Sequence, residues 1–211
     1  MRIEPDERRR QNWRIDEIAC DFELIDAWSL PAEGGPEEFA DLVELVQNAD
    51  PADDEASWLT RTLFQIRWTV GRWLGWDEPR DPLAIPGCTE TSLRDRLPED
   101  QRVASPPRAD DRENSSKSPF QPVYRDEREY FTEISNSTVH AVMHLGWVPV
   151  GGGRYRGQMG VYVKNRGRFG RYYMAFIAPF RHWIVYPAFM RRVDRRWRSR
   201  AGGPRAASAI S

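Results

Sequence analysis

The sequence has little cysteine and no long apolar run. Only Cys20 and Cys88 occur among 211 residues, and their separation fits neither a disulfide framework nor a zinc ribbon. No window approaches the roughly 18 uninterrupted apolar residues of a membrane-spanning helix. The opening residues MRIEPDERRRQNW lack the apolar core of a signal peptide. We therefore expect a soluble, cytoplasmic protein with reduced thiols.

Lysine is also scarce, and the charges are distributed unevenly. Lys117 and Lys164 are the only lysines among 31 basic residues. From Arg154 onward the chain has 14 basic residues and one acid, Asp194, whereas the preceding residues have 17 basic and 31 acidic. Such a split is typical of a basic half with an anionic partner, or of two halves that pack with opposite surfaces. The preference for arginine throughout the chain indicates compositional bias, so we expect no nucleic-acid partner.

Large aromatic side chains are the main apolar material of the chain. The sequence has 9 Trp, 9 Phe and 7 Tyr, while 30% of its residues are charged. These side chains bury large areas, so a packed interior can form and global disorder is excluded. The length predicts one domain over residues 19–198, with a flexible arm over 1–18 and a disordered tail over 199–211.

The first half of the domain has the pattern of one strand followed by two helices. Residues 20–30 alternate as in a strand that Pro31 ends. Apolar residues recur at helical spacing over 36–46 and again over 57–74. Residues 99–118 have almost no apolar content, so we expect a mobile loop there.

The second half predicts consecutive antiparallel strands and then one helix. Alternating patterns indicate strands separated by turns rich in Ser, Asn and Gly. The predicted strands cover residues 123–128, 129–134, 139–148, 155–164 and 169–178. Residues 180–200 have helical periodicity, and Pro187 must kink or divide this helix because proline lacks the backbone donor. The predicted fold class is α+β.

Three segments and one tryptophan carry a resemblance to a known family. They are DAWSLP (Asp26–Pro31), EISNSTVHAVMHLGWVP (Glu133–Pro149), GRFGRYYMAFIAPFRHWIVYPAFMRRV (Gly167–Val193) and Trp197. At these residues the chain resembles the family catalogued as domain of unknown function 2867. Its order of elements is similar to the helix-grip architecture of the START-like superfamily of pollen allergens and lipid-transfer proteins. The resemblance implies an antiparallel β-sheet wrapped around a long C-terminal α-helix, with two helices after the first strand.

The resemblance implies no activity, because that family has none established. Its members occur alone or behind a dehydrogenase-like nucleotide-binding domain. In this sequence no Gly-x-Gly-x-x-Gly motif follows a predicted strand, so we expect no cofactor. A nucleophilic Ser elbow, a Walker loop and an HExxH motif are missing too, so we assign no catalytic residue.

The three histidines are the candidates for polar chemistry. His140 and His144 lie on a predicted strand, where residues four apart are separated by roughly 13 Å and cannot share a zinc ion. We therefore predict no metal site. Strand alternation places Met143, Leu145 and Trp147 inward and these two histidines outward. The plain interpretation is ordinary strand histidines, with His182 as a polar residue at the start of the last helix. The alternatives are a polar rim of a pocket formed by His140, His144 and His182, or contacts with a partner.

The leading functional hypothesis is a helix-grip domain that binds a small hydrophobic or amphipathic ligand between the sheet and the C-terminal helix. The residues predicted to line this cavity are Met143, Leu145, Trp147, Val161, Val163, Tyr172, Met174, Phe176, Trp183 and Tyr186. A cyclase- or hydrolase-like enzyme that uses a cavity histidine is the second hypothesis.

The basic C-terminal helix admits a third hypothesis. Arginines occupy most of its polar side, and the helix also has tryptophans. The plain interpretation is a core helix with a solvated arginine face. The alternative is a weak contact with anionic membranes, or a protein-interaction surface. Neither interpretation predicts an oligomeric state.

Overall fold

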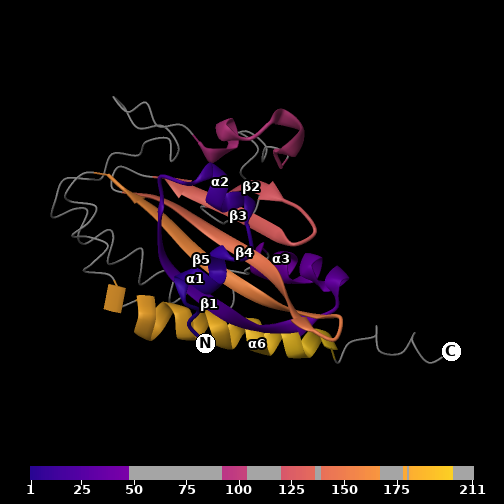
Figure 1. Ribbon diagram of the computed structural model, residues 1–211. Coiled ribbons are helices and arrows are strands. Elements are labelled where there is room, and N and C mark those ends of the chain that lie inside the picture. Colours follow the sequence, from indigo (N-terminus) through magenta and orange to yellow (C-terminus); the bar gives the residue numbers. More distant parts are fainter. Residues whose placement is uncertain (48–91, 104–119, 136–138, 167–177, 180, 202–211) are drawn as a thin grey trace, which may run out of the picture.

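An antiparallel sheet of five strands forms the centre of the molecule (Figure 1). The computed structural model describes residues 1–47, 92–103, 120–135, 139–166, 178–179 and 181–201. The strands are β1 (Glu23–Gly34), β2 (Gln121–Arg125), β3 (Glu129–Ser135), β4 (Val139–Gly151) and β5 (Arg154–Asn165). Their order across the sheet is β1-β5-β4-β3-β2, and each neighbouring pair is antiparallel. The predicted α+β class is confirmed; residues 169–177 of the last predicted strand lie outside the described residues.

The β4–β5 hairpin is the longest pairing in the sheet. Its turn contains Gly151, Gly152 and Gly153 with φ values of 98°, 60° and 71°, a region that disfavours residues with a Cβ. The predicted glycine turn is therefore confirmed. From it the register runs regularly from Pro149 opposite Tyr155 to Val139 opposite Asn165.

Strand β1 continues past Pro31, where the sequence pattern predicted its end. The register with β5 shifts between Ser29 and Glu33, and Pro31 lies in this irregular stretch. Among the described strands β1 lies at the edge of the sheet, where a residue without a backbone donor is tolerated. A second shift lies between Leu24 and Asp26.

Helices cover both faces of the sheet. On one face lie α3 (Phe39–Gln47), preceded by the 3-10 turn η1 (Pro36–Glu38), and α6 (Tyr186–Ala201), which Figure 1 shows in yellow along the sheet. On the other face lie α1 (Pro5–Arg9), α2 (Arg14–Ile18) and the 3-10 turns η2 (Leu93–Arg96) and η3 (Glu99–Gln101). None of the described helices is long and apolar enough to cross a membrane.

The two faces contribute to two separate apolar clusters. Val142 of β4 and Phe131 of β3 pack with residues of α2 and η2. Leu145 and Trp147 of β4 point the other way and pack with α3 and α6. The sheet is thus buried on both sides over most of β3, β4 and β5.

Residues 1–18 do not form the predicted flexible arm. Trp13 and Ile15 are buried in the cluster on the α2 face, and the Arg8 side chain has no exposed surface. Backbone bonds join this segment to β1, with Ile3 N–H donating to the Ala27 carbonyl at 2.9 Å. The segment is therefore an integral layer of the domain.

The last helix begins with a π-helical turn, η5 (Arg181–Val185), and continues as α6. The change of helix type lies next to Pro187, which agrees with the predicted division of the helix. The helix extends to Ala201, so the start of the predicted tail is helical, and residues 202–211 lie outside the described residues. The first residues of the predicted loop, 99–103, include the turn η3. The rest of that loop, 104–118, and the predicted helix over 57–74 lie outside the described residues.

Candidate functional site

Asp26 is a buried carboxylate that the bulge in β1 directs toward the C-terminal helix. Leu24 pairs with Tyr162 on the α2 face, whereas Asp26 pairs with Val161, which packs with the α6 cluster. Residues two apart on a regular strand share a face, so the extra residue, Ile25, is what turns Asp26 to the other side. The side chain of Asp26 has no exposed surface.

Three side chains from the last helix converge on this carboxylate. His182 Nε2 lies 2.6 Å from Asp26 Oδ1, and the Tyr186 hydroxyl donates to Oδ2 at 2.7 Å. An Arg181 nitrogen lies 3.2 Å from Oδ2. The π-helical turn and the first residue of α6 therefore supply every one of these partners. Residues of π-helical turns are frequently used in functional sites.

The arrangement fixes the state of the two neighbouring rings. Burial and the Asp26 carboxylate raise the pKa of Tyr186 well above its ordinary value, so Tyr186 remains a phenol that donates. A carboxylate has no hydrogen to donate, so the hydrogen in the His182 contact is on Nε2. A neutral His182 then keeps the lone pair of Nδ1 for another donor. The His182 side chain is 31% exposed, in contrast to Asp26.

Trp28 forms the aromatic wall of the same cluster. Its ring centroid lies 6.1 Å from that of His182 and 5.4 Å from that of Tyr186. Its Nε1 is buried and has no hydrogen-bond partner among the described residues. Buried donors in proteins are nearly always paired, so an unpaired one indicates a position for a water or a ligand acceptor. Val161, opposite Asp26 on β5, and Met143, opposite Val161 on β4, are the half-buried apolar neighbours.

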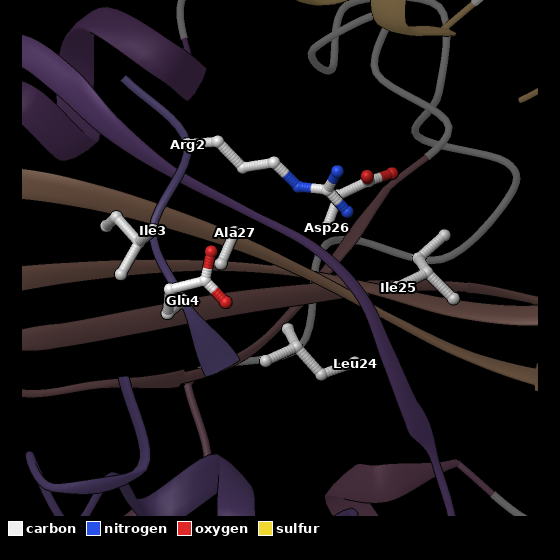
Figure 2. A pocket seen from close by; sticks show the side chains of 7 residues that line it. All are labelled: Arg2, Ile3, Glu4, Leu24, Ile25, Asp26 and Ala27. Carbon is white, nitrogen blue, oxygen red and sulfur yellow. The ribbon is translucent and has the colours of Figure 1, made fainter. Parts of the chain in front are cut away.

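A pocket of about 260 Å³ adjoins Asp26 on the edge of the sheet (Figure 2). It lies between the N-terminal residues and β1. The residues that line it are Arg2, Ile3, Glu4, Leu24, Ile25, Asp26 and Ala27. The pocket and the histidine cluster thus have Asp26 in common.

The structure fills much of the predicted cavity with protein. Leu145 and Trp147 have no exposed surface, and Trp147 Nε1 donates to the Gly35 carbonyl at 2.9 Å. They pack against α3 and α6, as the hydrophobic cluster on that face shows. Val163 is buried as well. Met143, Val161 and Tyr186 lie together at the Asp26 end of this face, and Tyr172, Met174 and Phe176 lie outside the described residues.

Trp183 is 80% exposed, although helical spacing predicted it beside Tyr186 on the inward side. The prediction assumed one α-helical phase of about 100° per residue. A π-helical turn contains one residue more than an α-helical turn. The side chains before the end of the turn are therefore rotated about the helix axis relative to those of α6. Trp183 lies inside that turn and is therefore turned away from the core.

His140 and His144 are buried, although strand alternation predicted them outward. They are 1% and 0% exposed because α2 and η2 cover the second face of the sheet. Each bonds a glutamate of β3: His140 Nε2 lies 2.8 Å from Glu133 Oε2, and His144 Nε2 lies 2.9 Å from Glu129 Oε1.

Each of these glutamates also holds the N-terminus of a helix. Glu129 accepts from the backbone N–H groups of Arg14 and Ile15 at 2.8 and 2.9 Å. Glu133 accepts from the Leu93 N–H at 2.9 Å and from the Ser92 hydroxyl. Carboxylates at such positions satisfy donors that the helix leaves unpaired. The two glutamate–histidine pairs therefore attach α2 and η2 to the sheet.

A buried arginine completes the network around His144. Arg8 Nη2 bonds Nδ1 of His144, and Arg8 Nε lies 3.3 Å from the Tyr162 hydroxyl, which donates to Asp16 at 2.8 Å. A Cβ on Gly160 would lie 2.5 Å from the Arg8 guanidinium, so this glycine makes room for it. Burial raises the pKa of Tyr162 to about 12. These groups are enclosed and serve packing, which separates them from the half-exposed His182.

No group of three or more His, Cys, Asp or Glu side chains suited to a metal ion occurs among the described residues.

Comparison with known families shows which family the chain belongs to. The model for the family described as "Protein of unknown function (DUF2867)" matches residues 18–188. The chain belongs to this family. No curated protein and no solved structure matches it.

The sequence pattern pointed to His182, but it did not point to Asp26 and Trp28, which contact His182, or to Arg181, which contacts Asp26. Asp26 and Trp28 lie in the DAWSLP segment that carries the resemblance, which was the available signal. The bulge that turns Asp26 toward α6 has no sequence signature of its own, because no glycine marks it.

Proposed function

We propose that the chain binds a small amphipathic ligand between β1 and the start of the C-terminal helix. The observation that carries the proposal is a fully buried Asp26 carboxylate that orients His182, whose ring stays partly exposed. A buried carboxylate that fixes one imidazole nitrogen leaves the other nitrogen in a defined position for a ligand. Membership of the START-like helix-grip superfamily is part of this proposal, and the antiparallel sheet with its C-terminal helix supports it.

The polar end of the ligand follows from two nitrogen atoms of the cluster, one on His182 and one on Trp28. His182 Nδ1 offers a lone pair, and the buried Trp28 Nε1 offers a hydrogen without an acceptor. A hydroxyl group both donates and accepts, so an alcohol-type head group satisfies both. The apolar part of the ligand lies against Val161 and Met143, the half-buried residues nearest Asp26.

This site is smaller than the cavity expected from the sequence. The deeper positions Leu145 and Trp147 are occupied by packing against α3 and α6, so they are not included. Tyr186 is retained, but as the phenol that holds Asp26. Trp183 is exposed beside His182, and of the predicted rim residues only His182 is included.

Native mass spectrometry of the purified protein tests the proposal first. We expect a discrete extra mass that is lost on denaturation, and a lower bound fraction in Asp26→Asn. The control is Asp21→Asn, which changes a carboxylate that bonds Arg96 and Lys164 on the surface. Equal occupancy in both variants would contradict binding at Asp26.

A matched pair of probes tests the hydroxyl requirement even if the protein is purified without ligand. We expect n-octanol to shift the ¹⁵N resonance of His182 Nδ1, because its hydroxyl donates to that atom. Methyl heptyl ether has a similar length and no donor, so its effect should be several-fold smaller. Two indistinguishable titrations would exclude this hydrogen bond.

A second candidate function is acid–base catalysis at the same place. The paired Asp26 and His182 make Nδ1 a base that can take a proton from a bound hydroxyl. Incubation of the ligand recovered from the first experiment with fresh protein distinguishes the two functions. A chemically changed ligand that needs His182 indicates an enzyme, and an unchanged ligand indicates a binding protein.

A further inference from the structure

The outward side of the last helix carries a basic stripe with one exposed tryptophan. Arg191, Arg195 and Arg198 are exposed, whereas Val193 and Trp197 are buried against the sheet. Successive α-helical residues are about 100° apart, so these three arginines lie within roughly 60° of one another. We call these residues with Trp183 the helix stripe.

Trp183 lies on the same side as the arginines because of the π-helical turn. In a continuous α-helix, eight residues would place it about 80° from Arg191. The additional residue of the π-helical turn reduces this offset to about 20°. The same rotation explains why Trp183 is 80% exposed.

The sequence from Arg154 onward is strongly basic, with 14 basic residues against one acid. Asp194 is the one acid after Arg154, and it bonds Arg198 at 2.8 Å. Farther round the helix, Arg200 bonds Glu38 and Asp41, so it belongs to the packing of α3 against α6. The helix stripe therefore presents three exposed guanidinium groups of a basic region beside an exposed tryptophan ring.

We propose that the helix stripe docks on anionic lipid membranes. Tryptophan favours the boundary between lipid head groups and acyl chains, and arginines beside it bind lipid phosphates. The stripe runs from Trp183 in η5 to Arg198 in α6, and α6 lies along the outside of the molecule (Figure 1). A helix of 16 residues is about 24 Å long and can contact several head groups at once.

A lipid surface fits better than a nucleic-acid duplex because of the tryptophan. Phosphate contacts with a duplex need only the arginines and would leave the Trp183 ring in water. Trp183 also adjoins His182, so a docked helix stripe brings the ligand site to the membrane. The docking proposal stands on exposure and charge alone, and it holds whether or not His182 binds a ligand.

Co-sedimentation with vesicles tests the docking. We expect binding to vesicles of phosphatidylglycerol and phosphatidylcholine at 20 mM salt, at least tenfold weaker binding at 500 mM salt, and none to pure phosphatidylcholine. The triple variant R191Q/R195Q/R198Q should lower the partition coefficient roughly a hundredfold, at about fivefold per arginine.

The control is a second triple variant that removes the same number of positive charges from other surfaces of the molecule. R10Q/R125Q/R154Q changes three exposed arginines outside the helix stripe, and it should bind within about twofold of the wild type. Trp183→Ala should weaken binding more than Val150→Ala, which truncates another exposed apolar residue. All these positions are exposed, so folding is retained, which circular dichroism checks.

Three results would overturn the proposal. They are no vesicle binding at 20 mM salt, an equal loss in the two triple variants, or tighter binding to DNA than to anionic vesicles. The last result would assign the helix stripe to nucleic acid. Vesicle binding is measured without the hydroxyl ligand, so this outcome is independent of the test at His182.

Discussion

Carboxylate–histidine pairs occur on both faces of the sheet, and they differ in exposure. On the α2 face, His144 bonds Glu129 and His140 bonds Glu133, and all four side chains are buried. On the α6 face, Asp26 is equally buried, but its partner His182 is 31% exposed. The same chemical pair thus occurs once as an enclosed attachment and once as an accessible group.

The remaining partners of each carboxylate explain the difference. The glutamates of β3 accept from backbone N–H groups of α2 and η2, so those pairs fix secondary structure to the sheet. The described partners of Asp26 are side chains, and it fixes the orientation of a ring. A histidine motif in a sequence therefore becomes informative only when the partners of its carboxylate are known.

The largest effect is expected from removal of Glu129. In Glu129→Leu the N–H groups of Arg14 and Ile15 and the His144 Nε2 lose their acceptor inside the core. Breaking a buried polar network in this way costs about 3–5 kcal/mol of unfolding free energy. Urea denaturation measures the loss, and the exposed Glu127→Leu serves as the control, with a change within about 0.5 kcal/mol. A loss below about 1 kcal/mol would contradict the attachment role.

A change in pH should have an intermediate effect on the unfolding free energy, through the pair of His144 and Glu129. Burial, and then the Arg8 charge, lower the pKa of His144 well below 6.5, so the folded protein keeps it neutral. An unfolded histidine takes up a proton near pH 6.5, so the stabilisation from His144 is present above that pH and lost as the pH falls. Burial raises the pKa of Glu129 from 4.5 to about 7, which acts oppositely: its cost to stability grows as the pH rises from 4.5 to 7.

Replacing the histidine separates these two contributions. We expect the unfolding free energy of the wild type minus that of His144→Gln to rise by up to about 1.4 kcal/mol per pH unit between pH 5 and 6.5. Urea denaturation at several pH values measures this difference. Thr132→Val, a buried change without a titrating group, should give a constant difference. A decrease with pH for His144→Gln would reverse the assignment.

The smallest effect on stability is expected at His182. The ring is partly exposed, and in His182→Gln the amide can still donate to Asp26. We expect a change of about 0.5 kcal/mol or less in the unfolding free energy. A loss as large as that of His144→Gln would make His182 a packing residue and remove the contrast between the two faces.

The strands could be predicted because their signal is local. Alternation and the glycine turn place β2 to β5 within a few residues of the observed bounds, since side chains on a strand alternate between faces. Pro187 likewise marked the division of the last helix. The burial of His140 and His144 could not be predicted that way, because it depends on a distant segment, α2, that covers the second face.

Residues 1–18, which contain α2, include apolar residues that indicate burial, although the segment is rich in charge. Trp13, Ile15 and Ile18 are apolar residues near the end of the stretch predicted to be flexible, and all three are buried. A Cβ on Gly146 would lie 2.6 Å from the Trp13 ring, so the β4 glycine and the tryptophan are a matched pair. Such a pair is recognisable only in three dimensions. The arginines near Trp13 in the sequence led to a prediction of disorder, because that prediction used composition alone.

The N-terminal pairing also protects the sheet from self-association. β1 is at the edge of the sheet formed by the described strands, and edge strands present unpaired backbone groups that can recruit a strand of another molecule. Ile3 N–H donates to Ala27, and Ser29 N–H donates to the Met1 carbonyl at 2.8 Å, so residues 1–3 occupy part of that edge. Pro31 removes a donor farther along the strand. The few residues that close one side of the Asp26 pocket thus also limit aggregation through the edge of the sheet.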